Sequence, residues 1–310
     1  MITELVDAEL RADGTAVLKC AFHEMGMGTA TAQTQIVADA LGLPVDAIRI
    51  EYGDSALPAG AVAGASAQTA STADSMSDVC EKLIKKIHDL ARRAPGSPLH
   101  GTRITQLQPQ AGALTLIGQP TVGESYTHIL TRAGQTSVSA HVGSDTRIGN
   151  IGFQARTIGA ALSRRRIVRA ATGAHFCQVR IDSDTGELRI TRWVGVFDIG
   201  RVVNTKTAAS QLRGGIVMGI GMTLSEETLI DPRTGRIMNP SLAEYHLPVH
   251  ADIPTIDIHC LDIPDPSMPV GILGAGEVGI IGVAAAIANA VHNATGRRIR
   301  DLPITLDKLM

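Results

Sequence analysis

Apolar residues recur three or four positions apart in several stretches of the chain, which is the spacing of one face of an α-helix. In the stretch that opens at Ser66, the apolar side chains of Val79, Leu83 and Ile87 share one face, and lysines occupy the other. A Pro-Gly-Ser-Pro run at residues 95–98 ends this pattern. We expect helices over residues 29–41, from residue 66 to this run, and over residues 125–132, 208–224 and 279–295.

Alternation of apolar and polar residues around turn-forming glycines predicts strands. Residues 9–22 have the pattern of two strands around an Asp13-Gly14 turn, and residues 176–182 and 187–196 alternate across Asp184-Thr185-Gly186. Further strands are expected at residues 47–52, 101–107, 136–142 and 256–261, with another hairpin at residues 231–235.

This order of elements predicts an α+β fold with mixed β-sheets and packed helices. A length of 310 residues suits two domains. We place their boundary near residue 165, so that residues 1–165 form the first domain, with a variable connection at 95–165, and residues 166–310 form the second. Both halves begin with a hairpin and then place a helix behind a glycine-rich loop.

The composition narrows the classes of partner. Lys and Arg total 28 against 30 Asp and Glu, a formal net charge of −2, so the basic surface typical of nucleic-acid binding is not encoded. The longest apolar stretches, near residues 214–224 and 278–288, are shorter than the ~18 residues that cross a bilayer. The acidic N-terminus differs from a signal peptide. We expect no nucleic acid and no membrane partner, and a cytoplasmic location, or a periplasmic one if a partner chain carries the export signal.

Cysteine and histidine spacing argues against a metal site built from side chains. The four cysteines form no Cys-x-x-Cys pair, so neither an iron–sulfur cluster nor a zinc ribbon is expected in this chain. Cys20 and His23 face opposite sides of a predicted strand, and Pro248 interrupts the helix that would bring His246 and His250 together. We therefore expect no side-chain metal ligands.

The string Gly274-Ala275-Gly276-Glu277-Val278-Gly279 fits the G-x-G-x-x-G pattern of dinucleotide-binding folds. Its position argues against that interpretation, since only one predicted helix and a short tail follow it. Glu277 would also repel a pyrophosphate, because it places a carboxylate in the turn. Two interpretations remain for Glu277 from the residues alone: a carboxylate that caps a helix, where the helix dipole favours it, or a group with a chemical role.

Three other donor-rich loops precede predicted helices. The string Glu24-Met25-Gly26-Met27-Gly28-Thr29 contains backbone N–H groups of the kind that bind anions, the string from Gly64 to Thr69 adds hydroxyl and amide groups, and residues 198–211 add Arg, Asn and Ser side chains. Each loop also has an ordinary explanation, as a tight turn, a Ser66 N-cap or a solvated loop. Together they describe a long anionic ligand held mostly by backbone, and beside such a ligand Glu277 gains a chemical role.

The order of these segments resembles one family. The blocks ELRADGTAVLKCAFHEMGMGT, GDSALPAGAVAGASAQTAS, SQLRGGIVMGIGMTLSEE, NPSLAEYHLPV and GAGEVGIIGVAAAIANAVHNATGRRIRDLPIT follow the order found in the C-terminal half of the molybdenum-binding (large) subunit of the xanthine dehydrogenase and aldehyde oxidoreductase family. The chain looks most similar to bacterial aldehyde oxidoreductases that use molybdopterin cytosine dinucleotide. The resemblance covers nearly the whole chain and implies the molybdenum cofactor-binding fold of that family.

The resemblance implies roles for particular residues. Glu277 follows the family's Gly-x-Gly motif and would be the catalytic base. No side chain would ligate the molybdenum, because the family holds the metal through the dithiolene sulfurs of the pterin. The resemblance assigns cofactor contacts to Gly26, Met27, Gly28, Ser66, Gln68, Thr69, Gly200, Arg201, Val202, Val203, Asn204, Thr205, Lys206, Ser210, Leu273, Gly274, Ala275 and Gly276.

Two positions depart from the common pattern of the family. Met27 stands where many members have Gln, so the side-chain amide that would bond an oxygen on the metal is missing. Val278-Gly279 replaces the Pro-Pro pair that often follows the glutamate in xanthine-oxidising members. The second departure favours aldehydes over purines as substrates.

The implied function is part of a molybdenum hydroxylase that oxidises aldehydes or N-heterocycles with water as the oxygen source. Electrons would pass to Fe-S and FAD centres on partner chains, and the implied partners are the N-terminal half of the molybdenum subunit, a 2Fe-2S subunit and an FAD subunit. The chain would be inactive alone. Two other interpretations stay open: a non-catalytic remnant or scaffold that binds no cofactor, and a Rossmann-type NAD dehydrogenase. We also expect the loops at residues 26–29 and 53–69 to be mobile when unfilled, because small residues make few buried contacts.

Overall fold

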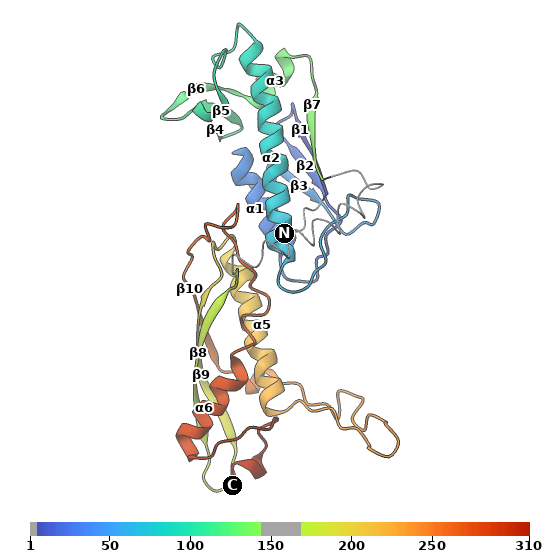
Figure 1. Cartoon of the computed structure of the whole chain (residues 1–310), viewed down its shortest axis with the longest axis vertical. Coiled ribbons are helices and arrows are strands. Elements are labelled where there is room, and N and C mark those ends of the chain that lie inside the picture. The colour runs from blue at the N-terminus through green and yellow to red at the C-terminus, as the bar shows by residue number, and fades with distance from the viewer. Residues whose placement is uncertain (1–4, 144–168) are drawn as a thin grey trace. The chain divides into compact units, whose positions relative to one another are not determined.

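The computed structural model of the chain describes residues 5–143 and 169–310 (Figure 1). The chain divides into two compact units. Unit 1 comprises Met1–Arg169 and Pro264–Ile272, and unit 2 comprises Ala170–Ile263 and Leu273–Met310. The expected boundary near residue 165 lies outside the described residues. The segment Pro264–Ile272 therefore belongs to unit 1, although a single boundary near residue 165 would assign it to the second domain.

Unit 1 is built on a four-stranded sheet in the order β3-β2-β1-β7. The expected hairpin around Asp13-Gly14 is confirmed, because β1 (Val6–Arg11) pairs antiparallel with β2 (Ala16–Lys19). β7 (Ser137–Val142) pairs antiparallel with β1, and β3 (Ile48–Glu51) runs parallel to β2. The sheet is therefore mixed, as expected.

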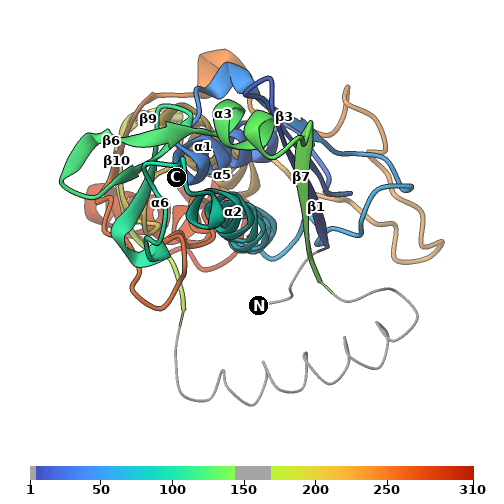
Figure 2. The ribbon, with the colours of Figure 1, turned by 90° about the horizontal axis from the view of Figure 1, so that it is seen from above.

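Two helices pack on this sheet. α1 (Thr29–Leu41) has the predicted bounds and ends at Gly42, whose φ of 60° is the left-handed conformation typical of a helix C-cap. α2 (Gln68–Arg93) is the long helix expected from the sequence, and its predicted apolar face, including Val79 and Leu83, is fully buried. Figure 2 views α2 along its axis, with β1 and β7 beside it.

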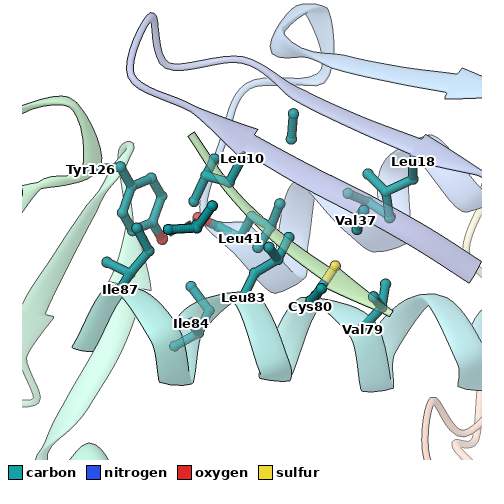
Figure 3. Close-up of a cluster of buried hydrophobic side chains, with 14 of the residues drawn as sticks. Leu10, Leu18, Val37, Leu41, Val79, Cys80, Leu83, Ile84, Ile87 and Tyr126 are labelled. Carbon is teal, nitrogen blue, oxygen red and sulfur yellow. Dashed lines mark hydrogen bonds between the residues drawn. The ribbon is translucent and has the colours of Figure 1, made fainter. Parts of the chain in front are cut away.

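The core of unit 1 is mostly aliphatic. Leu10 and Leu18 of the strands meet Val37 and Leu41 of α1 and the apolar face of α2 (Figure 3). Two aromatic residues, Phe22 and Tyr126, are fully buried in this core, and the Tyr126 hydroxyl donates a hydrogen bond to the Leu41 carbonyl at 2.6 Å. A buried hydroxyl needs such a partner to offset its loss of water.

A second, smaller sheet in unit 1 is absent from the sequence predictions. β4 (Leu107–Gln110), β5 (Ala113–Leu116) and β6 (Gln119–Ser125) form an antiparallel sheet. The expected strand at residues 101–107 is wrong, because that segment forms turns and a 3-10 helix (η2, Ile104–Gln106) before β4 begins. All three strands are short, and β4 and β6 are rich in polar residues, so their alternation is too weak to predict them.

The helix that follows β6 is confirmed. α3 covers Tyr126–Arg132, within the expected 125–132, and begins at a Ser125 N-cap whose hydroxyl accepts a hydrogen bond from the His128 N–H at 3.2 Å. Its Ile129 and Leu130 join the core of unit 1.

Unit 2 contains a three-stranded sheet in the order β10-β9-β8. β8 (Thr172–Ile181) and β9 (Leu188–Asp198) form the expected hairpin, and β10 (Thr255–Cys260) runs parallel to β9. α5 (Thr205–Leu224) and α6 (Val283–Thr295) supply the helices of this unit. Its core joins apolar side chains from all of these elements, including Trp193, Phe197, Leu212, Ile216, Val283 and Ile287. The predicted α+β fold with mixed sheets is confirmed.

Two helix starts in unit 2 differ from the expected positions. α5 begins three residues earlier than predicted, because Asn204 caps it and accepts a hydrogen bond from the Thr207 N–H at 2.9 Å. α6 begins at Val283 and not at residue 279. Residues 276–282 form turns, in which the Glu277 carbonyl accepts a hydrogen bond from the Ile280 N–H at 3.0 Å. The N-cap residue of α6 is therefore Gly282 and not a residue with a capping side chain.

An arm of residues 226–249 leaves the end of α5 and returns to η3 (His250–Asp252) (Figure 1). The expected hairpin at residues 231–235 is present as a tight turn, in which the Asp231 N–H donates to the Arg236 carbonyl at 2.9 Å. An isolated antiparallel bridge joins Ile230 and Ile237, with no longer strand beside it.

Candidate cofactor-binding site

The Gly26-Met27-Gly28 loop of unit 1 is held by a carboxylate from its own string. Glu24 Oε1 accepts hydrogen bonds from the Gly26 N–H at 2.9 Å and the Gly28 N–H at 3.0 Å, and Glu24 Oε2 accepts one from the Ala30 N–H at 3.0 Å. Gly26 and Gly28 have φ values of 102° and 82°, which favour glycine at both positions. These N–H groups are bonded within the chain, so the expectation that they bind an anion directly needs correction.

The loop before α2 has a strained backbone. Ala65 and Ser66 have φ values of 50° and 53°, in the left-handed region that residues with a Cβ rarely adopt. The expected Ser66 N-cap is wrong, because Ala67 is the N-cap residue and makes no side-chain cap hydrogen bond. Strain of about 1–3 kcal/mol per residue persists only where the surrounding structure determines it, and such positions cluster at functional sites.

Unit 1 brings these two loops together. Thr29, the first residue of α1, and Thr69, in the first turn of α2, are joined by a hydrogen bond of 2.8 Å between their hydroxyl oxygens. Gln33 strengthens the junction, since its Nε2 donates to the Thr69 carbonyl at 2.9 Å. Residues of the two predicted cofactor-binding loops, 40 positions apart in the sequence, therefore lie side by side.

Two buried amide oxygens stand at this junction without a donor among the described residues. Gln68 is 4% exposed; its Nε2 donates to the Ala61 carbonyl at 3.1 Å, and its Oε1 has no partner. Gln33 is fully buried, and its Oε1 likewise has none. A buried acceptor without a donor costs about 1–3 kcal/mol. Both oxygens can accept a hydrogen bond from an N–H or O–H group of a ligand or of water.

In unit 2, the predicted donor-rich loop within residues 198–211 is also held by carboxylates. The Gly200 N–H donates to Asp198 Oδ1 at 3.1 Å, and the Val202 N–H donates to Asp262 Oδ1 at 2.7 Å. On the helix that follows, the predicted cofactor contacts Thr205, Lys206 and Ser210 are exposed. Lys206 and Ser210 are four residues apart in α5, so they share one side of its first turns. This side presents an ammonium and hydroxyl groups suited to an anion.

The segment that carries Glu277 runs beside this loop. The Leu273 N–H donates to the Ile199 carbonyl at 2.9 Å, which places the predicted contacts Leu273–Gly276 next to the start of the 200–206 segment. Glu277 is exposed, and Val278 after it is buried in the core of unit 2. The G-x-G-x-x-G string lacks the strand-turn-helix setting of a dinucleotide fingerprint, since it forms turns and α6 begins only at Val283.

Glycines of α5 allow the turns after Glu277 to approach the helix closely. A Cβ on Gly215 would lie 2.9 Å from the Gly279 carbonyl carbon and 3.0 Å from the Ile280 nitrogen. A Cβ on Gly279 would in turn lie 2.7 Å from the Leu212 carbonyl oxygen. Contact between backbones at this distance requires glycine, so α5 fixes the position of the turn behind Glu277.

Gly215→Ala is expected to destabilise unit 2 by about 1–3 kcal/mol, because the added methyl group overlaps the backbone of Gly279 and Ile280. Chemical denaturation followed by circular dichroism measures the change. Gly214→Ala is the matched control: a Cβ there meets nothing within 4 Å, and alanine is favoured over glycine in a helix by about 1 kcal/mol. Equal losses in the two variants would contradict the close-packing explanation.

His175 is a neighbour of the Glu277 segment that the sequence patterns do not single out. Its Nε2 lies 3.4 Å from the Val278 carbonyl oxygen, and its ring packs edge-on against Trp193 and Phe197, with centroids 5.7 and 5.1 Å apart. Burial lowers the pKa of His175, although the Val278 carbonyl opposes this effect. Alternation along β8 identifies a strand position only, so this long-range contact leaves no signal in the sequence. Glu24, by contrast, lies in the predicted loop string itself.

The described residues, 5–143 and 169–310, include neither a membrane-spanning helix nor a side-chain metal cluster. In those parts of the chain, no helix is long and apolar enough to cross a membrane. The same residues hold no group of three or more His, Cys, Asp or Glu side chains that could bind a metal ion.

Comparison with known proteins identifies the family. The sequence profile of the family described as molybdopterin cofactor-binding domain matches residues 3–254. The aldehyde oxidoreductase molybdenum-binding subunit PaoC of Escherichia coli (strain K12) is 34% identical over 309 residues, which cover 97% of this chain and 37% of the relative. The putative xanthine dehydrogenase molybdenum-binding subunit XdhA of the same strain is 30% identical over 305 residues, with coverages of 96% and 37%. The chain thus spans a little over a third of the length of these relatives.

Solved structures share the fold. Quinoline 2-oxidoreductase from Pseudomonas putida 86 matches with a TM-score of 0.80 and 25% identity over 99% of this chain and 38% of that protein. Aldehyde oxidoreductase from Desulfovibrio gigas matches with a TM-score of 0.71 and 24% identity over 99% of this chain and 30% of that protein. The chain therefore belongs to the molybdopterin cofactor-binding domain family, in the group of molybdenum-dependent oxidoreductases related to aldehyde oxidoreductase and xanthine dehydrogenase.

Proposed function

We propose that this chain is the part of a molybdenum hydroxylase subunit that holds molybdopterin cytosine dinucleotide and supplies the catalytic base, Glu277. The observation that carries the proposal is the setting of Glu277. Glu277 is exposed, and its backbone is held on both sides. Before it, the Leu273 N–H is bonded to the Ile199 carbonyl, and after it, Gly279 packs closely against α5. A fixed backbone behind an exposed carboxylate suits a group that must meet a substrate at a defined position.

The residues present fit such a cofactor. In unit 1, the unpaired oxygens of Gln33 and Gln68 match the N–H donors of a pterin ring. In unit 2, Lys206 and Ser210 at the start of α5 suit the phosphates and the sugar of the nucleotide end, where the helix dipole also favours negative charge. The remaining proposed contacts are Gly26, Met27, Gly28, Ser66, Thr69, Gly200, Arg201, Val202, Val203, Asn204, Thr205, Leu273, Gly274, Ala275 and Gly276.

The proposed chemistry assigns a proton transfer to this chain. When bound, the molybdenum cofactor would supply the two-electron oxidation of the substrate. Glu277 would act as general base, and its carboxylate would accept the proton of the water-derived nucleophile as the new C–O bond forms. Such a base contributes about 10²–10⁴-fold to a rate. Val278-Gly279, which stands where xanthine-oxidising members of the family often have Pro-Pro, supports aldehydes over purines as the proposed substrates.

The proposal requires partners, because the chain spans 37% of its relatives. We propose that the rest of the molybdenum subunit completes the substrate pocket, and that a 2Fe-2S subunit and an FAD subunit receive the electrons. The arm of residues 226–249 supports a partner in this region, since it exposes the large apolar side chains of Leu229, Ile230, Ile237, Met238, Leu242, Leu247 and Val249. Exposed apolar surface of this kind marks interaction sites.

The test is the molybdenum and pterin-nucleotide content of this chain, purified together with a chain that supplies the rest of the subunit. We expect close to one molybdenum and one cytosine nucleotide for each pair of chains. A well-folded pair that contains neither would refute cofactor binding and would leave the non-catalytic scaffold as the better explanation.

A further inference from the structure

We propose that Glu24 is a positioning residue whose carboxylate holds the Gly26–Gly28 loop and the first turn of α1 in the conformation that receives the cofactor, before any cofactor binds. The receiving role rests on the proposed function. The holding role does not, because it follows from hydrogen bonds within unit 1 alone.

The two oxygens of the Glu24 carboxylate bond different parts of this segment. Oε1 accepts from the N–H groups of Gly26 and Gly28, at 2.9 and 3.0 Å, and so closes the loop on itself. Oε2 accepts from the Ala30 N–H at 3.0 Å, inside the first turn of α1. The N-cap residue of α1, Gly28, has no side chain to perform this function. One side chain thus satisfies one donor of the loop, Gly26, and two donors, Gly28 and Ala30, that a free helix start would leave to water.

The charge of Glu24 suits this position. Burial by itself would raise the pKa of Glu24, but the N–H groups of Ala30, Gly28 and Gly26 outweigh it and hold the pKa below its ordinary value. The positive end of the α1 dipole stabilises the same charge. The carboxylate therefore stays ionised at neutral pH and keeps all three hydrogen bonds.

This arrangement determines which part of the ligand the loop can meet. With three N–H groups bonded to Glu24 and a negative charge beside them, the loop is a poor site for phosphate. An uncharged part of the cofactor, such as the pterin, fits it better. The loop would then contribute a preformed shape, and ligand binding would not have to order it.

Hydrogen bonds from α1 connect the segment that Glu24 holds to the loop before α2. Ala30, which Glu24 fixes, follows Thr29, whose hydroxyl is bonded to that of Thr69. Gln33, one turn further along α1, bonds the Thr69 carbonyl. We therefore expect an ordered first loop in the cofactor-free chain, in place of the mobile one that its small residues predict.

Hydrogen exchange of individual amides in the cofactor-free chain tests the holding role. In Glu24→Ala, exchange at Gly26, Gly28 and Ala30 should rise about tenfold or more. Glu24→Gln keeps a single acceptor oxygen, so it should protect either the Gly26 and Gly28 pair or Ala30, and not all three. Unchanged exchange at these amides in Glu24→Ala would overturn the proposal.

The control is Ile36→Val, which removes one methylene group from the buried side of the same helix without touching the loop. It should lower the melting temperature and leave exchange at Gly26 and Gly28 as in the wild type. If Ile36→Val accelerates these amides as much as Glu24→Ala does, general loss of stability explains the effect, and the proposal fails.

Cofactor retention tests the receiving role separately. If the wild-type assembly holds molybdenum and pterin, Glu24→Ala should lose them about tenfold faster on dilution, while Ile36→Val should not. Equal retention in Glu24→Ala and the wild type would overturn the receiving role. A wild-type assembly that takes up no cofactor would refute the proposed function itself, and amide exchange would still decide whether Glu24 holds the loop.

Discussion

Glu277→Gln is expected to lower the turnover of the assembled enzyme by about 10²–10⁴-fold without changing its molybdenum content. Glutamine has the size of glutamate, so the backbone held by Leu273 and by α5 stays in place. The amide cannot accept a proton at neutral pH, so the step proposed for Glu277 is lost. Turnover of an aromatic aldehyde per bound molybdenum measures the effect, because this ratio separates chemistry from cofactor loading.

Glu187→Gln is the control for this experiment, since Glu187 is another exposed glutamate of unit 2 and is neither a proposed cofactor contact nor part of the arm of residues 226–249. It should leave both turnover and molybdenum content as in the wild type. If Glu277→Gln keeps wild-type turnover at full cofactor content, Glu277 is not the base. If it loses the cofactor, its role is structural.

Glu124→Gln is expected to destabilise unit 1 by about 3 kcal/mol. The Glu124 side chain is only 2% exposed and is surrounded by three partners. The Ser97 hydroxyl donates to Oε2 at 2.5 Å, His128 Nδ1 lies 2.6 Å from Oε1, and the Arg132 guanidinium is bonded to the same oxygen. Replacing the charge leaves the Arg132 guanidinium without its counter-ion in a site that is mostly shielded from water. Urea denaturation measures the loss.

The same carboxylate makes the stability of unit 1 depend on pH. Burial opposes ionisation of Glu124, but hydrogen bonds from Ser97, Arg132 and His128 outweigh it, so the pKa lies below the ordinary value. A pKa that folding lowers contributes stability above the unfolded value of about 4.3, and this contribution disappears as the pH falls through the folded value. Glu124→Gln should therefore flatten the decline in stability below about pH 4.3.

Glu9→Gln is the matched control, because Glu9 also pairs with an arginine of unit 1, Arg11, with side chains 33% and 44% exposed. Solvent screens such a pair, so its removal should cost much less than that of Glu124. Comparable losses in the two variants would contradict the burial argument.

Short-range signals predicted most elements, and they failed where the signal is weak or long-range. The bounds of α1 follow from its composition and the Gly42 C-cap, and the β8–β9 hairpin follows from its turn residues. The sheet at residues 107–125 was missed because its strands are short and its outer strands β4 and β6 are rich in polar residues. The start of α6 was placed too early because residues 279–282 form turns, and Gly279 packs closely against α5.

In the candidate site, too, local patterns could be predicted from the sequence and long-range contacts could not. The glycine strings, the proposed cofactor-binding segments and Glu277 can be found in the sequence, because each is a local pattern and their order identifies the family. The tertiary structure alone decided which groups satisfy one another: Glu24 takes the N–H groups that the loop presents, Thr29 meets Thr69, and Leu273 meets Ile199. These contacts join residues through hydrogen bonds whose partners depend on how the chain folds. Local composition shows that a donor exists, and only the folded backbone determines which acceptor reaches it.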